Sequence, residues 1–142
     1  MISDALFSSE RMDWETPRAL FDKLNEEFAF TLDPCASKHN HKCEKYYTIT
    51  DNGLSKDWGN ERVFCNPPYG RSIYYWVKKC AAHTGLCVML IPARTDTKWF
   101  HEFIYQKPNV EIRFIMGRIR FVGAKHPAPF PSMVVVFNPG KK

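Results

Sequence analysis

Two adjacent prolines constrain the fold of this chain more than any other feature of its sequence does. The apolar run at 63–65 leads directly into Asn66, Pro67, Pro68 and Tyr69. Proline has no backbone N–H and holds its own φ at about −65°, so a strand formed by the apolar run must end at Asn66. The sequence therefore predicts a strand that ends in a rigid turn carrying an amide and an aromatic ring.

The length and composition predict a single globular domain over residues 1–142, with residues 1–13 as a flexible N-terminus. Hydrophobic residues make up 44% and charged residues 25% of the chain, which is typical of ordinary globular proteins. No apolar stretch approaches the roughly 18 residues of a membrane-spanning helix, and the N-terminus lacks the pattern of a secretion signal. We therefore expect a cytoplasmic protein whose five cysteines are free thiols.

The apolar periodicity alternates between strand and helix along the chain. Thr16 is expected to cap a helix at 16–28 whose first helical residue is Pro17. A short strand at 28–32, stopped by Pro34, is followed by residues 37–61, which are predicted to be mostly loop with one short helix. The remaining predicted elements are strands at 62–66, 85–92 and 109–115, helices at 72–83 and 96–106, and a closing pair of strands at 118–123 and 132–138.

This order predicts an α/β fold: a mostly parallel sheet with an antiparallel end and helices on both faces. Ligands of such sheets bind beyond the carboxyl ends of the strands, where the strand order reverses. Asp33 and Asn66 each follow a predicted strand and precede a proline, so we expect their side chains to point into one crevice. The alternative is that each side chain only caps its own turn.

The sequence around these residues carries a family resemblance. Asn-Pro-Pro-Tyr after a strand is the catalytic motif of amino methyltransferases that use S-adenosylmethionine. The ordered set WETP, LDPCAS, LSKDW, FCNPPYG, MLIPARTDTKWF and GRIRF, within residues 14 to 137, resembles the phage-type Dam DNA adenine-N6 methyltransferases. The resemblance implies a compact Rossmann-like methyltransferase fold, S-adenosylmethionine as cofactor, double-stranded DNA as partner, and the cytoplasm of a bacterial host, with a bacteriophage or prophage origin.

The same resemblance implies roles for the residues of the rigid turn. The side-chain oxygen of Asn66 and the carbonyl of Pro67 would accept the two hydrogens of the adenine N6 amine, while Pro68 helps to hold these acceptors in place. Tyr69 would stack on the adenine after the base leaves the duplex. This chemistry requires no metal.

The resemblance also implies a cofactor site. The residues concerned are Thr16, Pro17, Asp33, Pro34, Cys35, Ala36, Asp57 and Trp58. Glycine-rich turns commonly let a backbone approach a cofactor closely. The turn after Asp33 contains no glycine, so the small side chains of Ala36 and Ser37 must allow this approach instead. Trp58 can equally be a core or lid aromatic.

The charge balance favours a polyanionic partner. Lys and Arg number 20 against 15 Asp and Glu, and the second half of the chain mixes basic and aromatic residues. The predicted DNA-binding residues are Arg71, Arg94, Arg118, Arg120 and Lys125. The alternatives are a strand with a solvated basic face and, near Arg94, a helix cap made by Thr95 or Asp96. Because no segment is long enough for a separate target-recognition domain, specificity is expected to come from short loops or a partner chain, or to be low.

Other functions remain open at this stage. Cys35, His39, His41 and Cys43 form a C-x3-H-x-H-x-C cluster, but its spacing is tighter than that of paired zinc knuckles, and we predict no metal. The same catalytic turn could serve another planar amine, such as cytosine N4 or a protein glutamine. A non-catalytic DNA-binding module that retains the fold is the third alternative. The sequence predicts neither the recognition site nor the oligomeric state.

Overall fold

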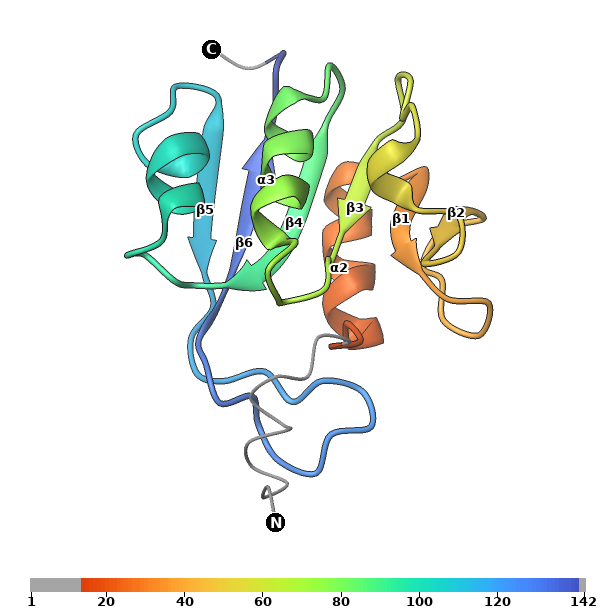
Figure 1. Cartoon of the computed structure of the whole chain (residues 1–142). Coiled ribbons are helices and arrows are strands. Elements are labelled where there is room, and N and C mark those ends of the chain that lie inside the picture. The colour runs from red at the N-terminus through yellow and green to blue at the C-terminus, as the bar shows by residue number, and fades with distance from the viewer. Residues whose placement is uncertain (1–13, 141–142) are drawn as a thin grey trace.

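Six strands of the described residues, 14–140 of this computed structural model, form one mixed sheet in the order β2-β1-β3-β4-β6-β5 (Figure 1). Its strands are β1 Leu32–Ala36, β2 Lys45–Thr48, β3 Val63–Cys65, β4 Cys87–Pro92, β5 Val110–Phe114 and β6 Ser132–Phe137. The strands β2, β1, β3 and β4 are parallel, whereas β6 runs antiparallel to both β4 and β5. The predicted α/β sheet with an antiparallel end is confirmed. The predicted flexible N-terminus, residues 1–13, lies outside the described residues.

Helices cover both faces of this sheet. The helical elements are α2 Arg18–Phe28, the 3-10 turn η1 Gly53–Ser55, α3 Ile73–Ala82 and the π-helical turn η2 Phe100–Ile104. Neighbouring residues of a strand point to opposite faces. The ring of Phe64 lies 5.1 Å from that of Phe21 in α2, while the thiol of Cys65 faces Cys80 of α3. Hence α2 and α3 pack on opposite faces, as Figure 1 also shows.

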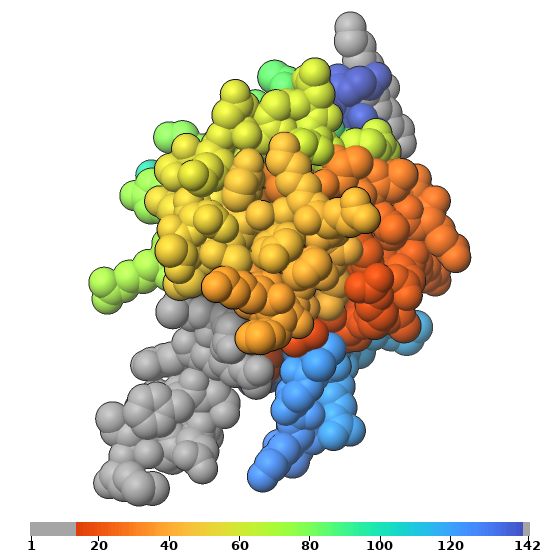
Figure 2. All heavy atoms as spheres, turned by 90° about the vertical axis from the view of Figure 1, so that its right-hand side faces the viewer, coloured from red at the N-terminus to blue at the C-terminus, as the bar shows by residue number. Residues whose placement is uncertain are grey.

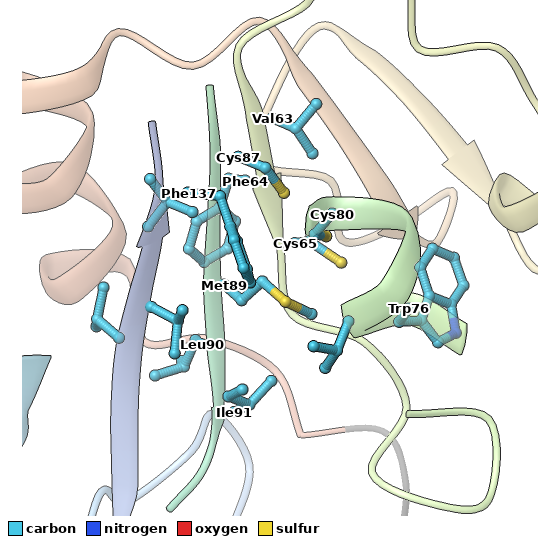
Figure 3. Packing of buried hydrophobic residues seen from close by; sticks show 14 of the residues in the cluster. Val63, Phe64, Cys65, Trp76, Cys80, Cys87, Met89, Leu90, Ile91 and Phe137 are labelled. Carbon is cyan, nitrogen blue, oxygen red and sulfur yellow. The ribbon is translucent and has the colours of Figure 1, made fainter. Parts of the chain in front are cut away.

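The centre of the sheet is the most apolar part of the molecule. All six residues of β4 and all six of β6 are buried. Strands that are covered on both faces read as continuous apolar runs rather than alternating ones, which is why CVMLIP and SMVVVF are recognisable in the sequence. Figure 3 shows Met89, Leu90 and Phe137 packed in this layer. No helix within residues 14–140 has the length and apolar character needed to cross a membrane.

The predicted strand at 28–32 is wrong. The helix α2 continues to Phe28, Ala29 takes a left-handed conformation with φ 51°, and β1 then runs through Pro34 to Ala36. A proline interrupts a strand only where its missing N–H is needed by a neighbour. Here the β1–β2 register shifts between Asp33 and Ala36, so Pro34 lies at the irregularity.

Two further predictions fail at the edges of the sheet. The segment predicted as loop contains the edge strand β2, which lacks a long apolar run. The strand predicted at 118–123 is irregular, because Gly117 and Gly123, with φ of 77° and 80°, turn the chain at both ends of it. The partner of β6 at this edge is β5, and the closing pair of the sheet is therefore β5–β6.

Candidate active site at the carboxyl ends of β1, β3 and β4

The site lies where the strand order of the sheet reverses. From β1 the chain passes to the edge strand β2 on one side, and it then returns to β3 on the other side of β1. The carboxyl ends of β1 and β3 are therefore adjacent at the position where parallel sheets bind ligands. The Sγ atoms of Cys35 and Cys65 are 3.6 Å apart across this junction. Burial raises the pKa of both thiols well above the ordinary value, so neither is a thiolate nucleophile.

Within residues 14–140, the amide of Asn66 is hydrogen-bonded at its nitrogen but not at its oxygen. Its Nδ2 donates to the backbone carbonyl of Trp14 and, at 2.8 Å, to Oγ1 of Thr16. A backbone carbonyl can only accept, so the contact with Trp14 determines which way the amide faces. Its Oδ1 is shielded from solvent and has no hydrogen-bond partner within residues 14–140. Unpaired buried acceptors are rare, and they are often kept for a functional reason.

Thr16 is not the helix cap that the sequence predicts. The helix α2 begins at Arg18 with Pro17 in the capping position and no side-chain capping bond. The side chain of Thr16 is buried and its hydroxyl oxygen accepts from Asn66. The neighbouring residue Glu15 lies with its carboxylate 3.6 Å from the ammonium of Lys42. Residues 14–16 therefore connect the end of β3 with the segment that follows β1.

Asp33 holds the turn after β1. Its Oδ1 accepts from the backbone N–H of Cys35 at 3.2 Å, and its Oδ2 accepts from that of Lys42 at 2.9 Å. The side chain is buried, and this desolvation raises the pKa of the carboxyl more than the two bonds lower it. Asp33 thus makes the turn-capping bonds of the alternative, and its predicted contact with the cofactor stays a prediction.

Tyr69 connects the turn after β3 with β4 through a hydrogen bond. Its hydroxyl donates to the carbonyl of Leu90 at 2.8 Å, and the side chain is only 5% exposed. Burial raises the pKa of the phenol well above the ordinary value, so it stays neutral. The rings of Phe121 and Phe130 meet the Tyr69 ring edge to face, at centroid distances of 6.3 and 5.6 Å. Arg94, at the end of β4, places its guanidinium 5.8 Å from the Phe130 ring centroid.

The other predicted site residues lie in three places. Pro67 is buried and Pro68 half-buried within the turn, and Arg71 is exposed just before α3. Asp57 is exposed and accepts from the N–H of Gly59 at 2.8 Å. Arg118, Arg120 and Lys125 are all exposed on the connection from β5 to β6.

Trp58 is a core aromatic in this structure. Its indole N–H donates to the carbonyl of Gly53 at 3.0 Å, its ring stacks on Trp76 at 6.4 Å, and the ammonium of Lys79 lies 4.8 Å above it. It therefore packs against α3 and η1. Near Arg94, the hydroxyl of Thr97 makes the capping contacts of the turn, rather than Thr95 or Asp96.

The Cys and His cluster does not assemble. Within residues 14–140 no group of three or more His, Cys, Asp or Glu side chains is arranged to hold a metal ion. Cys35 faces Cys65, whereas the ring of His41 stacks on Tyr46 at 4.0 Å. Burial raises the pKa of Cys43 to about 12.

Sequence reasoning missed two contributors to the site. Trp14 supplies the carbonyl that orients Asn66, and Lys42 links the turn of Asp33 to Glu15. A backbone acceptor carries no sequence signal of its own. The segment WETP was noticed, but its contact with Asn66 joins positions 52 residues apart, which local patterns do not report.

Comparisons with known proteins identify the family of this chain. The family described as DNA N-6-adenine-methyltransferase (Dam) matches residues 4–139. A DNA N-6-adenine-methyltransferase of Escherichia phage T1 is 39% identical over 94 residues, which are 63% of this chain and 39% of the phage protein. A DNA N-6-adenine-methyltransferase of Haemophilus phage HP1 is 28% identical over 141 residues, covering 92% of this chain and 81% of the phage protein. This chain spans about two fifths of the length of the first relative and most of the second. Because the family match extends over nearly all its residues, the chain belongs to the Dam family of DNA N-6-adenine-methyltransferases.

Proposed function

We propose that this chain transfers a methyl group from S-adenosylmethionine to the N6 amine of an adenine flipped out of double-stranded DNA. The observation that carries the proposal is the unpaired, buried Oδ1 of Asn66. An amide held by two contacts at its nitrogen end, with a free acceptor at its oxygen end, is suited to bind an N–H donor. The exocyclic amine of adenine is such a donor.

The chemistry requires acceptors that are in place before the reaction. The lone pair of the adenine amine is delocalised into the ring, so the nitrogen is a poor nucleophile. Oδ1 of Asn66 and the carbonyl of Pro67 would accept its two hydrogens and draw the nitrogen towards tetrahedral geometry. The fixed φ of Pro67 and Pro68 keeps these acceptors from reorganising, which is the condition under which electrostatic stabilisation is most effective.

Tyr69 would stack on the adenine. Flipping a base costs a few kcal/mol, and one aromatic stacking contact is worth roughly 1–3 kcal/mol. Since the side chain is only 5% exposed, the stack requires Phe121 or Phe130 to give way when the base enters. The hydrogen bond from its hydroxyl to Leu90 holds the ring at the end of β4 during this exchange.

The residues at the end of β1 fit a methyl donor bound beside Asn66. The hydroxyl oxygen of Thr16 is used by Asn66, so its hydrogen remains available to a polar ligand. We assign Thr16, Pro17 and the turn Pro34–Ala36 to the cofactor, with Asp33 holding this turn through the N–H groups of Cys35 and Lys42. S-adenosylmethionine supplies a methyl group made electrophilic by its sulfonium. The assignment of Asp57 and Trp58 to the adenosine stays a prediction.

The strand order supports the Rossmann-like description of the fold. The four parallel strands β2-β1-β3-β4 reverse their order next to β1, as in doubly wound sheets that bind nucleotides. The exposed cations Arg71, Arg94, Arg118, Arg120 and Lys125 are assigned to the DNA.

The test replaces Asn66 in two ways and measures single-turnover methyl transfer to a duplex with one adenine site. Asn66→Ala should lower the rate by about 10²–10³, the usual cost of deleting one preorganised group. Asn66→Asp keeps an acceptor but loses the donor to Trp14 while it is ionised, so its rate should recover only as the pH falls and the acid becomes protonated.

The exposed Asn60 provides a matched control, because Asn60→Ala should leave the rate unchanged. Full activity of a folded Asn66→Ala variant would disprove the mechanism. Methylation of a duplex without adenine would instead identify cytosine N4 as the acceptor, and cofactor binding without any methyl transfer would identify a non-catalytic module.

A further inference from the structure

The β5–β6 loop, residues 115–131, extends from the same edge of the sheet as the site. Because β6 is antiparallel to both β4 and β5, the strand β5 runs in the direction of β4, and its carboxyl end lies at the edge where β1, β3 and β4 end. Figure 1 shows the loop passing beyond that edge. In Figure 2 it forms a narrow blue lobe that projects from the body of the molecule.

This lobe is basic and lacks acidic residues. Residues 112–142 contain no Asp or Glu. Arg118, Arg120, Lys125 and His126 are all exposed on the loop. A projecting surface with cations and no carboxylates complements a polyanion, and the sequence-independent part of DNA binding comes from such phosphate neutralisation.

The loop is ordered by its own hydrogen bonds. The N–H of Ala128 donates to the carbonyl of Ile119 at 2.7 Å, which joins the two arms of the loop at one point. The N–H of Ala124 donates to the carbonyl of Phe121 at 3.1 Å and closes a turn around Gly123. A recognition loop that is already ordered loses less conformational entropy when it binds.

The guanidinium of Arg120 is held in one orientation. Its Nε donates to the carbonyl of Ala124 at 3.0 Å. Within the described part of the chain this is the hydrogen bond that positions it, and the two Nη groups remain available to a ligand. Such a fork matches two acceptors side by side, as on the O6 and N7 edge of guanine in the major groove.

Two buried aromatic rings anchor the loop to the site. Phe121 and Phe130 each lie 5.3 Å from the ring of Trp14, whose carbonyl orients Asn66. The N–H of Val122 also donates to the carbonyl of Glu15 at 3.1 Å. The position of the loop is thereby tied to the residues that would hold the target adenine.

We infer that the β5–β6 loop reads the DNA sequence next to the target adenine, by entering the major groove with Arg120 as its main base contact. The inference rests on the proposed function. The groove is about 12 Å wide, and the loop projects from the body of the molecule as a narrow lobe (Figure 2).

The test is equilibrium binding of the full chain, without methyl transfer, to duplexes with one adenine and randomised flanking bases, followed by sequencing of the bound fraction. Arg120→Ala should reduce discrimination at one base position by roughly 5- to 100-fold, the range for loss of one bidentate base contact. Arg120→Lys should restore little of it, since a lysine cannot reproduce the fork.

Lys56→Ala, an exposed cation on the segment after η1, is the control and should leave discrimination unchanged. The contrary result is that Arg120→Ala weakens binding equally for all sequences and reduces by about one the slope of log affinity against log salt concentration. That result would show that Arg120 contacts phosphate and would overturn the inference. Absence of any preference in the wild-type chain would overturn it as well. Methyl transfer to the same duplexes tests the proposed function separately, so either can fail without the other.

Discussion

Asn66 is held at its nitrogen end by two partners that come from one short segment. The carbonyl of Trp14 fixes which way the amide faces, and the hydroxyl of Thr16 accepts its second hydrogen. From the sequence alone, Asn66→Asp would be a mild change, because a carboxylate accepts the same hydrogen bond as the amide oxygen. At neutral pH, however, an ionised carboxylate cannot donate the two hydrogen bonds that Asn66 makes to Trp14 and Thr16, so the substitution becomes a substantial change.

The contact between Thr16 and Asn66 leads to a prediction at this scale. Thr16→Val keeps the shape of the side chain but removes the acceptor, whereas Thr16→Ser keeps the acceptor. One neutral hydrogen bond contributes about 0.5–1.5 kcal/mol, so we expect Thr16→Val to lower the single-turnover rate by about threefold to tenfold and Thr16→Ser to remain close to the wild type.

The measurement is the rate at saturating S-adenosylmethionine, together with the affinity for the cofactor by calorimetry. A rate that does not change, with weaker cofactor binding, would assign Thr16 to the cofactor alone. Equal losses in the Val and Ser variants would mean that the residue acts through packing.

At the scale of the elements, the short turn η1 supports the end of β1. A Cβ atom on Gly53 would lie 2.5 Å from the carbonyl oxygen of Pro34 and 3.1 Å from the ring of Trp76. The carbonyl of Gly53 also binds the indole of Trp58. Only a residue without a side chain fits between η1, α3 and the turn that we assign to the cofactor.

We therefore predict that Gly53→Ala lowers the free energy of unfolding by about 1–3 kcal/mol, as is typical of overpacking. It should also weaken cofactor binding, since Pro34 must move. Urea denaturation and calorimetry provide the two measurements. Gly140→Ala is the control, because the nearest atom to its Cβ is 3.8 Å away. Unchanged stability of Gly53→Ala would mean that η1 does not pack on β1 in solution.

At the scale of the whole molecule, several exposed cations lie on the connections beyond the edge of the sheet that carries the site. The chain has a formal charge of +5, and the loop next to the site has no acidic residue. If the four exposed cations Arg71, Arg94, Arg118 and Lys125 each neutralise one phosphate, while Arg120 contacts a base, the logarithm of the affinity should fall with the logarithm of the salt concentration with a slope of roughly −3 to −4.

Between about 50 and 200 mM salt this slope corresponds to a loss of affinity on the order of 10². Fluorescence anisotropy with a short duplex measures it directly. The combined replacement of Arg118 and Lys125 by alanine should reduce the slope by about two. A response to salt that is flat in the wild type would contradict DNA binding through these residues and would favour a protein or small-molecule acceptor.

The sequence by itself determined the strong local features of this protein. The helices α2 and α3 follow from apolar residues at helical spacing, β4 and β6 from continuous apolar runs, and the end of β3 from the two prolines after Asn66. These signals depend on neighbours along the chain, so they can be read without a structure. The turn Asn66–Tyr69 is one of them, and its residues are part of the motif set that resembles the family.

Tertiary structure decided whatever depends on partners far along the chain. The start of β1, the edge strand β2 and the pairing of β6 with β5 were set by the register of the sheet rather than by local propensity. Thr16, predicted as a helix cap, instead accepts a hydrogen bond from Asn66. A buried amide donor needs an acceptor, and the folded chain brings this hydroxyl to it. Only the fold could place Trp14, Glu15 and Lys42 around the two turns, since hydrogen bonds and ion pairs across the sheet leave no periodic trace in the sequence.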